Sequence, residues 1–143
     1  MKKIALLLLT TLFVIILSAC TNRATSAAAG DYIEIPLAEI TGQLKAYSLT
    51  DDGVQIKYFV VLGSDGIPRT AFEACDVCGG DKGYEQQGNN IKCRKCGKVF
   101  TIDGLGTQNN GYGCWPSYLP NEIKGDNLLI KVEDIKNGRA RFI

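Results

Sequence analysis

The hydrophobic and polar positions of this chain fall mostly into short runs, as they do in β-strands. Residues 54–62 alternate at first and then become continuously apolar, which is typical of a strand that enters a core covered on both faces. Similar short runs of β-branched and aromatic residues are separated by Gly, Asp and Asn. They predict strands at residues 33–35, 44–49, 67–74, 84–87, 91–92, 127–132 and 139–143.

Turn sequences between these runs predict how the strands are connected. Asp51-Asp52-Gly53 and Ser64-Asp65-Gly66 separate consecutive strands and favour hairpins. A helical pattern is short and confined to residues 133–136. The sequence therefore predicts a mostly β fold class: a small, mostly antiparallel β domain.

The N-terminal segment has the pattern of an export signal. Lys2 and Lys3 precede an apolar run of 14 residues, 4–17, which is shorter than the roughly 20 residues that a membrane-spanning helix needs. Leu17-Ser18-Ala19-Cys20 resembles the site at which bacterial lipoproteins are cut and lipidated. We expect a lipoprotein signal peptide at residues 1–19 and a lipid-modified Cys20, with a free cysteine as the alternative.

Residues 21–30 are small and polar and show no apolar periodicity. They are typical of a flexible linker, so residues 20–31 are expected to form the lipidated cysteine and a tether. Residues 32–143 are then a Cys-rich metal-binding β domain. The expected location is extracytoplasmic, anchored to the cell membrane by the lipid on Cys20.

The composition excludes several kinds of site. The chain has no His, and its one Met is Met1. His-based catalytic triads, c-type haem attachment, blue-copper sites and Rieske centres with His ligands are therefore excluded. The balance of 16 Lys and Arg against 15 Asp and Glu argues against electrostatic binding to nucleic acid. Most of the chemistry must come from the six cysteines.

Two Cys-x-x-Cys motifs are the main candidate site. Cys75 and Cys78 form the first, and Cys93 and Cys96 form the second after 14 intervening residues. This spacing is typical of two knuckles that share one metal. Four thiolates suit zinc, a single iron or an iron–sulfur cluster, and the spacing does not choose among them. A zinc ribbon that only staples the fold and a pair of disulfides are the alternatives.

Cys114 is the odd cysteine, in the sequence Gly111-Tyr112-Gly113-Cys114-Trp115-Pro116. With Cys20 lipidated, five thiols remain and cannot all pair with one another. Cys114 is therefore predicted to act at the metal site, as an alternative ligand, a ligand to a second metal or a redox thiol. The alternative is a small buried packing residue. Trp115, Tyr112 and Phe100 are expected to pack in the core and cover the site.

Several motifs, in order along the chain, resemble the FtrD-like family of membrane iron–sulfur proteins. The motifs are Arg69-x-Ala71-Phe72-x-Ala74-Cys75-Asp76-x-Cys78, Gly83-Tyr84-x-Gln86-x-Gly88, Ile91-x-Cys93-x-x-Cys96-Gly97 and Gly113-Cys114-x-Pro116. The resemblance covers roughly residues 33 to 143. It implies a redox centre at the outer face of the membrane that serves ferrous-iron uptake. Many members also carry transmembrane helices, which a lipid anchor would replace here.

The leading hypothesis is a membrane-anchored iron or iron–sulfur protein that transfers electrons or handles metal. Its ligands would be Cys75, Cys78, Cys93 and Cys96, with Cys114 at the same centre, and its partners a ferrous-iron permease or another redox protein. The knuckles also resemble, more distantly, a Rieske-type layout with Cys in place of His. A zinc-stapled binding module and a thiol–disulfide oxidoreductase are the rival functions. An accessory protein is favoured over a stand-alone enzyme.

Overall fold

The computed structural model describes residues 28–80, 82–107 and 113–143. These residues form three small antiparallel sheets, one short α-helix and three short 3-10 helices. The mostly β, antiparallel class predicted from the sequence is confirmed. The predicted signal peptide, Cys20, most of the tether, and Gly111 and Tyr112 of the Cys114 loop lie outside the described residues.

The first sheet joins the two ends of the described chain. Its strands, in the order in which they pair, are β1 (Ala28–Ala29), β2 (Tyr32–Pro36), β10 (Asn127–Lys131) and β9 (Glu122–Lys124). β2 and β10 are antiparallel, and Leu128 and Ile130 lie opposite Ile35 and Ile33. β1 lies within the segment that the sequence assigned to the tether, and β9 is too short and too exposed for its hydrophobic pattern to have indicated it.

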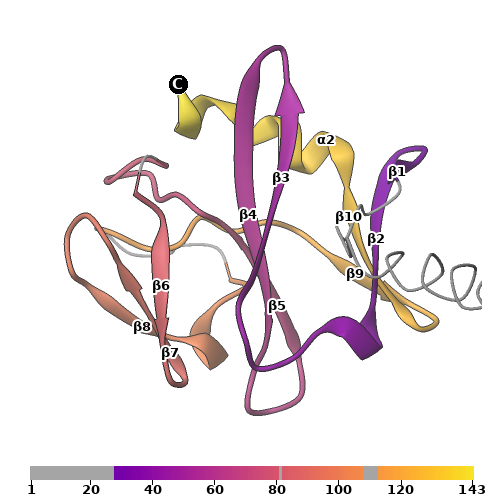
Figure 1. Cartoon of the computed structure of the whole chain (residues 1–143), viewed down its shortest axis with the longest axis horizontal. Coiled ribbons are helices and arrows are strands. Elements are labelled where there is room, and N and C mark those ends of the chain that lie inside the picture. The colour runs from indigo at the N-terminus through magenta and orange to yellow at the C-terminus, as the bar shows by residue number, and fades with distance from the viewer. Residues whose placement is uncertain (1–27, 81, 108–112) are drawn as a thin grey trace, which may run out of the picture.

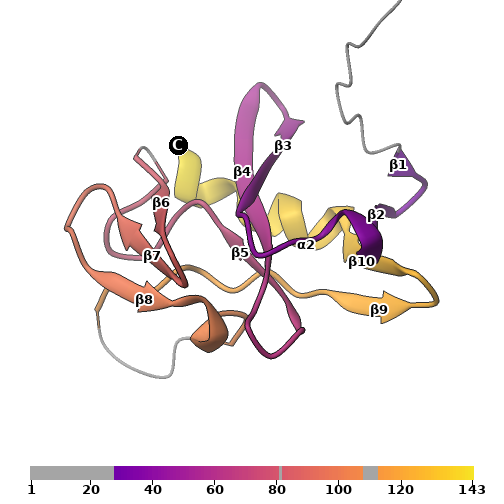
Figure 2. The same cartoon turned by 60° about the horizontal axis from the view of Figure 1, so that its bottom comes forward.

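The other two sheets are formed by consecutive strands. Their strands are β3 (Lys45–Asp51), β4 (Val54–Leu62) and β5 (Pro68–Phe72) in one, and β6 (Tyr84–Gln87), β7 (Asn90–Cys93) and β8 (Val99–Thr101) in the other. The predicted hairpins at residues 51–53 and 64–66 are present, and the predicted strands 84–87 and 91–92 also form a hairpin, in which Asn90 already pairs with Gln87. The β3–β5 sheet stands between the other two (Figure 1), and the same order is visible after rotation (Figure 2).

β4 connects two separate hydrophobic cores because successive side chains of a strand point to opposite faces. Ile56, Tyr58 and Val60 face the core that lies against the β2–β10 sheet. Phe59 and Val61 face the second core, which also contains three of the cysteines. This explains why residues 58–61 of β4 are all buried, as the change from alternating to continuous apolar residues predicts.

The C-terminal segment differs from its prediction. The short helix expected near residues 133–136 is present as α2 (Val132–Asn137). Residues 139–143 were predicted to be a strand, and this prediction is wrong: Arg139–Phe142 is the 3-10 helix η3. Gly138 packs directly against the ring of Phe72, where any Cβ would overlap the ring. The backbone therefore turns at this point, and the Arg141 carbonyl accepts a hydrogen bond from the Gly80 N–H at 2.9 Å instead of pairing in a sheet.

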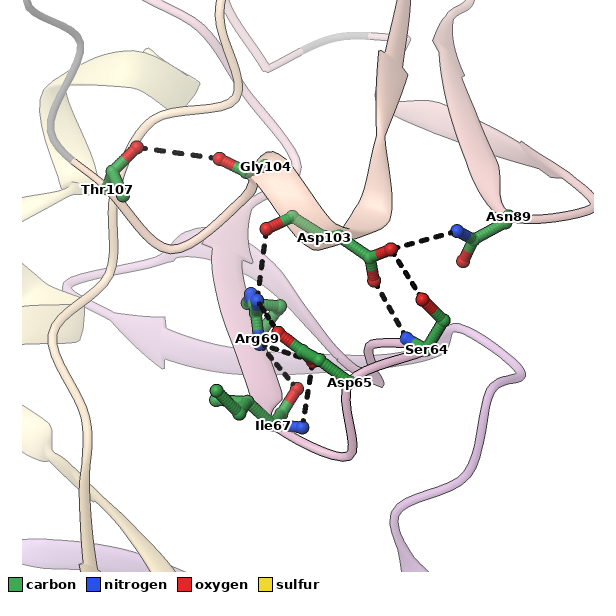
Figure 3. Close-up of polar contacts among 8 residues, drawn as sticks. All are labelled: Ser64, Asp65, Ile67, Arg69, Asn89, Asp103, Gly104 and Thr107. Carbon is green, nitrogen blue, oxygen red and sulfur yellow. Dashed lines mark hydrogen bonds and ion pairs between the residues drawn. The ribbon is translucent and has the colours of Figure 1, made fainter.

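A polar network joins the β4–β5 turn to the β6–β8 sheet (Figure 3). Arg69, only 9% exposed, donates to the Asp65 carboxylate at 2.7 Å and to the Asp103 carbonyl at 3.0 Å. Asp103, in the 3-10 helix η2 (Ile102–Gly104), accepts hydrogen bonds from the N–H and the hydroxyl of Ser64 and from the side-chain amide of Asn89. This network fixes the sheet that carries the second knuckle against the rest of the domain.

We expect Asp103→Asn to destabilise the domain in a pH-dependent way. The hydrogen bonds from the Ser64 hydroxyl and N–H lower the pKa of Asp103 below its ordinary value. A carboxylate with a depressed pKa in the folded state stabilises the fold above its ordinary pKa of about 4, and that contribution is lost as the pH falls through the folded pKa. The variant should therefore melt at a lower temperature than the parent at neutral pH, and the difference should shrink by about pH 2.5.

Thermal unfolding at the two pH values measures this effect. Glu122→Gln on the exposed strand β9 is the matched control, because it removes the same charge outside the network. A melting difference for Asp103→Asn that persists unchanged at the lower pH would contradict the expectation.

Candidate metal centre

The two Cys-x-x-Cys motifs form knuckles of the same local geometry. In each, the glycine four residues after the first cysteine donates its N–H to the carbonyl of that cysteine: Gly79 to Cys75 at 2.8 Å and Gly97 to Cys93 at 2.9 Å. Both glycines have φ near +75°, at 72° and 76°, a conformation that other residues adopt only with strain. The glycine after each second cysteine therefore allows the chain to fold back around the sulfurs.

The knuckles belong to different elements and are joined by side-chain contacts. The first follows β5, and the second begins at the end of β7, where Cys93 pairs with Tyr84 of β6. The Lys95 ammonium, at the tip of the second knuckle, donates to the carbonyl of Cys78 in the first at 2.8 Å. The sequence could not predict this contact, because nothing in the local pattern around Lys95 shows which carbonyl it reaches.

Cys114 reaches the knuckles because the chain that follows it lies beside the extension of β5. The Phe72 N–H donates to the Ser117 carbonyl, and the Ser117 N–H donates to the Ala74 carbonyl, both at 2.9 Å. Ser117 is buried, and its hydroxyl contacts Asp76 and Arg141. This pairing brings a cysteine that is 39 residues distant in sequence to within 3.3 Å, sulfur to sulfur, of Cys75.

The sulfur atoms of Cys78, Cys93, Cys96 and Cys114 all lie within 4.8 Å of one another. The Cys78 and Cys114 sulfurs are 3.8 Å apart. Cys75, which the sequence grouped with the other knuckle cysteines, lies outside this group of four and contacts it through Cys114. All five predicted site cysteines therefore gather in one place. Cys114 contacts both cysteines of the first knuckle and lies within 4.8 Å of both cysteines of the second.

The five thiols differ in burial. Cys75, Cys93 and Cys114 are 1%, 3% and 9% exposed, Cys78 is partly buried, and Cys96 is exposed. Among the described cysteines none is disulfide-bonded. The site is therefore buried on the side of Cys75 and open to the surface at Cys96.

The environment also shifts the pKa values of four of the thiols. The backbone N–H of Lys98 is the main cause that lowers the pKa of Cys96, to about 7. Burial raises the pKa of Cys78 to about 12, and burial likewise raises the pKa of Cys114. Burial would raise the pKa of Cys75 too, but the N–H of Cys78, 2.9 Å from the Cys75 sulfur, and the Cys114 thiol lower it below its ordinary value. The knuckle amides thus stabilise thiolates, the form that binds metals.

Aromatic side chains enclose the cluster, as predicted for Phe100 and Trp115. Tyr84 and Phe100 make an edge-to-face pair at 6.3 Å between ring centroids, and Phe100 and Trp115 make another at 5.4 Å. The Tyr84 hydroxyl and the Trp115 indole N–H are buried and have no hydrogen-bond partner in the described structure. Buried donors without partners are uncommon, and burial raises the pKa of Tyr84, which also lies close enough to the thiols of Cys75, Cys93 and Cys114 for their charges to raise it further.

The sulfur positions meet the geometric needs of a thiolate-bound metal. A tetrahedral ion with metal–sulfur bonds of about 2.3 Å places its sulfurs about 3.8 Å apart. The group of four fits such an ion, and the lack of any His leaves a purely sulfur ligand set. Iron and zinc both accept this ligand set. In a cluster the thiolates bind different iron atoms, which requires a wider separation of the sulfurs.

Residues 40–142 match the model of a family described as membrane iron-sulfur containing protein, FtrD-like. The chain belongs to this FtrD-like family. The match includes all five cysteines of the cluster and most of the described sheets. No curated protein and no solved structure matches the chain. The distant resemblance to a Rieske layout or a zinc ribbon stays unconfirmed, whereas the family resemblance seen in the sequence is confirmed.

Proposed function

We propose that the protein is a membrane-anchored, extracytoplasmic iron protein that transfers electrons or handles metal in ferrous-iron uptake. The observation that carries the proposal is the group of four cysteine sulfurs within 4.8 Å of one another, in a chain of a family described as iron–sulfur proteins. Cys78, Cys93, Cys96 and Cys114 would hold the metal. Cys75 would support Cys114 from the buried side.

Bound iron, as a single ion or in an iron–sulfur cluster, supplies one-electron chemistry at this site. The chain itself provides the conditions for that chemistry. The amides of the knuckles stabilise the thiolate form, and Phe100 and Trp115 exclude water from the buried side. Cys96 is exposed, so one edge of the centre is accessible to a partner. Electron transfer requires such an edge and no substrate pocket.

The membrane anchor is the second part of the proposal. No helix in the described part of the chain has both the length and the apolar character to cross a bilayer. The family is described as membrane proteins, and the lipoprotein pattern that ends at Cys20 provides a covalent anchor. The partners would be a ferrous-iron permease or another redox protein in the same membrane.

Anaerobic purification from the native host, followed by metal analysis and an absorption spectrum, tests the proposal. Iron should be the main metal, with visible absorption that changes on reduction with dithionite and returns on oxidation. Zinc as the main metal, without visible absorption, would indicate a structural metal that staples the fold. Protein without metal would contradict the proposal altogether.

We expect Tyr84→Phe to lower the reduction potential of the bound iron with little loss of stability. The Tyr84 hydroxyl is buried beside the cluster, and burial and the nearby sulfur charges raise its pKa, so it stays protonated. A protonated hydroxyl stabilises negative charge on the thiolates, and its removal disfavours the more negative, reduced state. Spectroscopic redox titration measures the shift. An unchanged potential in a folded, fully loaded variant would show that the hydroxyl does not act on the centre.

A further inference from the structure

A basic groove lies beside the proposed centre. It has a volume of about 550 Å³, and Cys78 forms part of its wall. Lys57 from β4, Lys95 from the second knuckle and Arg141 from η3 line it, and no Asp or Glu is among its described lining residues. Three cationic side chains from distant parts of the sequence therefore meet next to one of the proposed metal ligands.

The second knuckle extends this positive region around the exposed edge of the centre. Residues 92–98 contain four cations, Lys92, Arg94, Lys95 and Lys98, and no acidic residue. Arg94, Lys95 and Lys98 are exposed on either side of Cys96, which is itself exposed. We define the basic face as Lys57, Arg94, Lys95, Lys98 and Arg141.

Among the described residues, Asp76 and Glu73 lie near the basic face and are engaged with the protein itself. Asp76 forms an ion pair with Arg141 at 3.0 Å and accepts a hydrogen bond from Ser117. Glu73 is partly buried, accepts a hydrogen bond from the Tyr84 N–H at 3.2 Å, and has its pKa raised by burial. They offset part of the charge of Arg141, Arg94 and Lys57, and Lys98 lies exposed two residues after Cys96.

The two segments that carry the knuckles also expose aliphatic side chains. Val77, at the tip of the first knuckle, is 66% exposed, and Val99, directly after Lys98, is 50% exposed. Exposed apolar side chains among charged ones are typical of protein–protein contacts. A small anion would use the groove alone and would gain nothing from Val77, Val99 or the cations of the second knuckle.

We propose that the basic face is the docking surface for an acidic region of a partner redox protein. This inference rests on the proposed function, because the docking would bring the partner's redox group to the edge at Cys96. A single electron would pass between the bound iron and that group, so that one is oxidised as the other is reduced, without a bond or a proton being transferred. Charge complementarity would mainly accelerate association and leave the complex short-lived.

The first test uses small redox probes of opposite charge. The reduced protein is mixed with the anion ferricyanide or with the cation tris(phenanthroline)cobalt(III), and the rate of oxidation is followed at increasing salt concentration. The ferricyanide rate should fall with added salt, and the cobalt rate should rise or stay constant. Arg94→Glu with Lys98→Glu should lower the ferricyanide rate at low salt about tenfold and reverse its salt dependence.

Lys124→Glu with Lys131→Glu is the matched control, because it changes the net charge by the same amount. Both control lysines are exposed, on β9 and β10, in the sheet on the far side of β3–β5 from the second knuckle (Figures 1 and 2). The control should leave the ferricyanide rate within about twofold of the parent. Equal effects of the two double variants would show that only net charge matters, and would overturn the docking proposal.

A second readout does not depend on redox activity. Hexacyanochromate(III) is paramagnetic and anionic and broadens the NMR signals of the residues that it approaches. Broadening should centre on the basic face, including the Val77 and Val99 methyls, and should be lost in the Arg94→Glu and Lys98→Glu variant. Broadening limited to the groove and unchanged by this variant would indicate a small-anion site and overturn the proposal. If the protein as isolated contains no iron, the proposed function fails, while this readout still decides whether the face binds anions.

Discussion

Cys114→Ser is expected to abolish metal binding, whereas Cys75→Ser should retain the metal with weakened affinity. The Cys114 sulfur belongs to the group of four within 4.8 Å, whereas the Cys75 sulfur lies outside it and contacts the Cys114 sulfur and the Cys78 N–H. Serine is nearly the same size as cysteine but is a poor ligand for soft metals. Loss of a direct ligand removes most of the metal affinity, and loss of a supporting group costs about 10–100-fold.

Metal content after dialysis against a mild chelator measures the difference between the two variants. The thermal stability should follow the same order, because binding free energy in such sites is also folding free energy, about 10–16 kcal/mol for structural zinc sites in small peptides. Cys78→Ser, Cys93→Ser and Cys96→Ser should behave like Cys114→Ser. If Cys75→Ser loses the metal and Cys114→Ser keeps it, the four knuckle cysteines are the ligands and Cys114 is a packing residue.

Phe59→Ala is expected to lower the free energy of unfolding by about 3–5 kcal/mol, the usual cost of removing a buried aromatic ring. Phe59 is completely buried on the face of β4 that packs against the cysteine cluster. Its ring contacts Tyr84 edge to face at 6.1 Å between centroids. The cavity would therefore lie behind the proposed metal centre.

Denaturant unfolding of the metal-loaded protein measures this loss. Phe59→Leu keeps most of the apolar volume and should cost less than half as much as the alanine variant. Leu49→Ala is a control on the same sheet, because Leu49 is only partly buried and packs at the edge of the other core. A cost for Phe59→Ala no larger than that of Leu49→Ala would show that the second core contributes little to stability.

The hairpins were predictable because the turn sequences and hydrophobic patterns that specify them are local in the sequence. β4 was predicted with its exact bounds, since both of its ends are turn sequences and its hydrophobic pattern is continuous. The strands at 84–87 and 91–92, between the knuckles, were predicted for the same reason. β8 and β9 were missed because each has only three residues and is stabilised mainly by pairing with a longer neighbour.

The C-terminal segment shows how a tertiary contact overrides a local pattern. Arg-Ala-Arg-Phe-Ile alternates as a strand does, but Gly138 sits against Phe72, and the Phe142 ring packs near the same side chain at 6.4 Å between centroids. The first contact requires a glycine, and the Arg141 carbonyl bonds to the Gly80 N–H rather than to a strand. Neither contact is visible in the sequence, because Phe72 is more than sixty residues away.

Contacts between residues that are distant in the sequence also limited the prediction of the candidate site. Spacing identified both knuckles, and the odd count of thiols placed Cys114 at the centre. The sequence could not show that Cys114, rather than Cys75, completes the closest group of four, because this depends on pairing between the chain at Ser117 and the extension of β5. Tyr84 was predicted only as a strand residue, and its unpartnered hydroxyl became evident from its burial.

X-ray absorption at the iron K edge of the anaerobically isolated protein tests the proposed iron centre most directly. The expected result is iron surrounded by sulfur at about 2.3 Å, with no nitrogen or oxygen ligands. An additional iron–iron distance would identify a cluster, and its absence a single ion in the group of four. Absence of iron, or iron bound by oxygen or nitrogen alone, would contradict the assignment of the cysteines as its ligands.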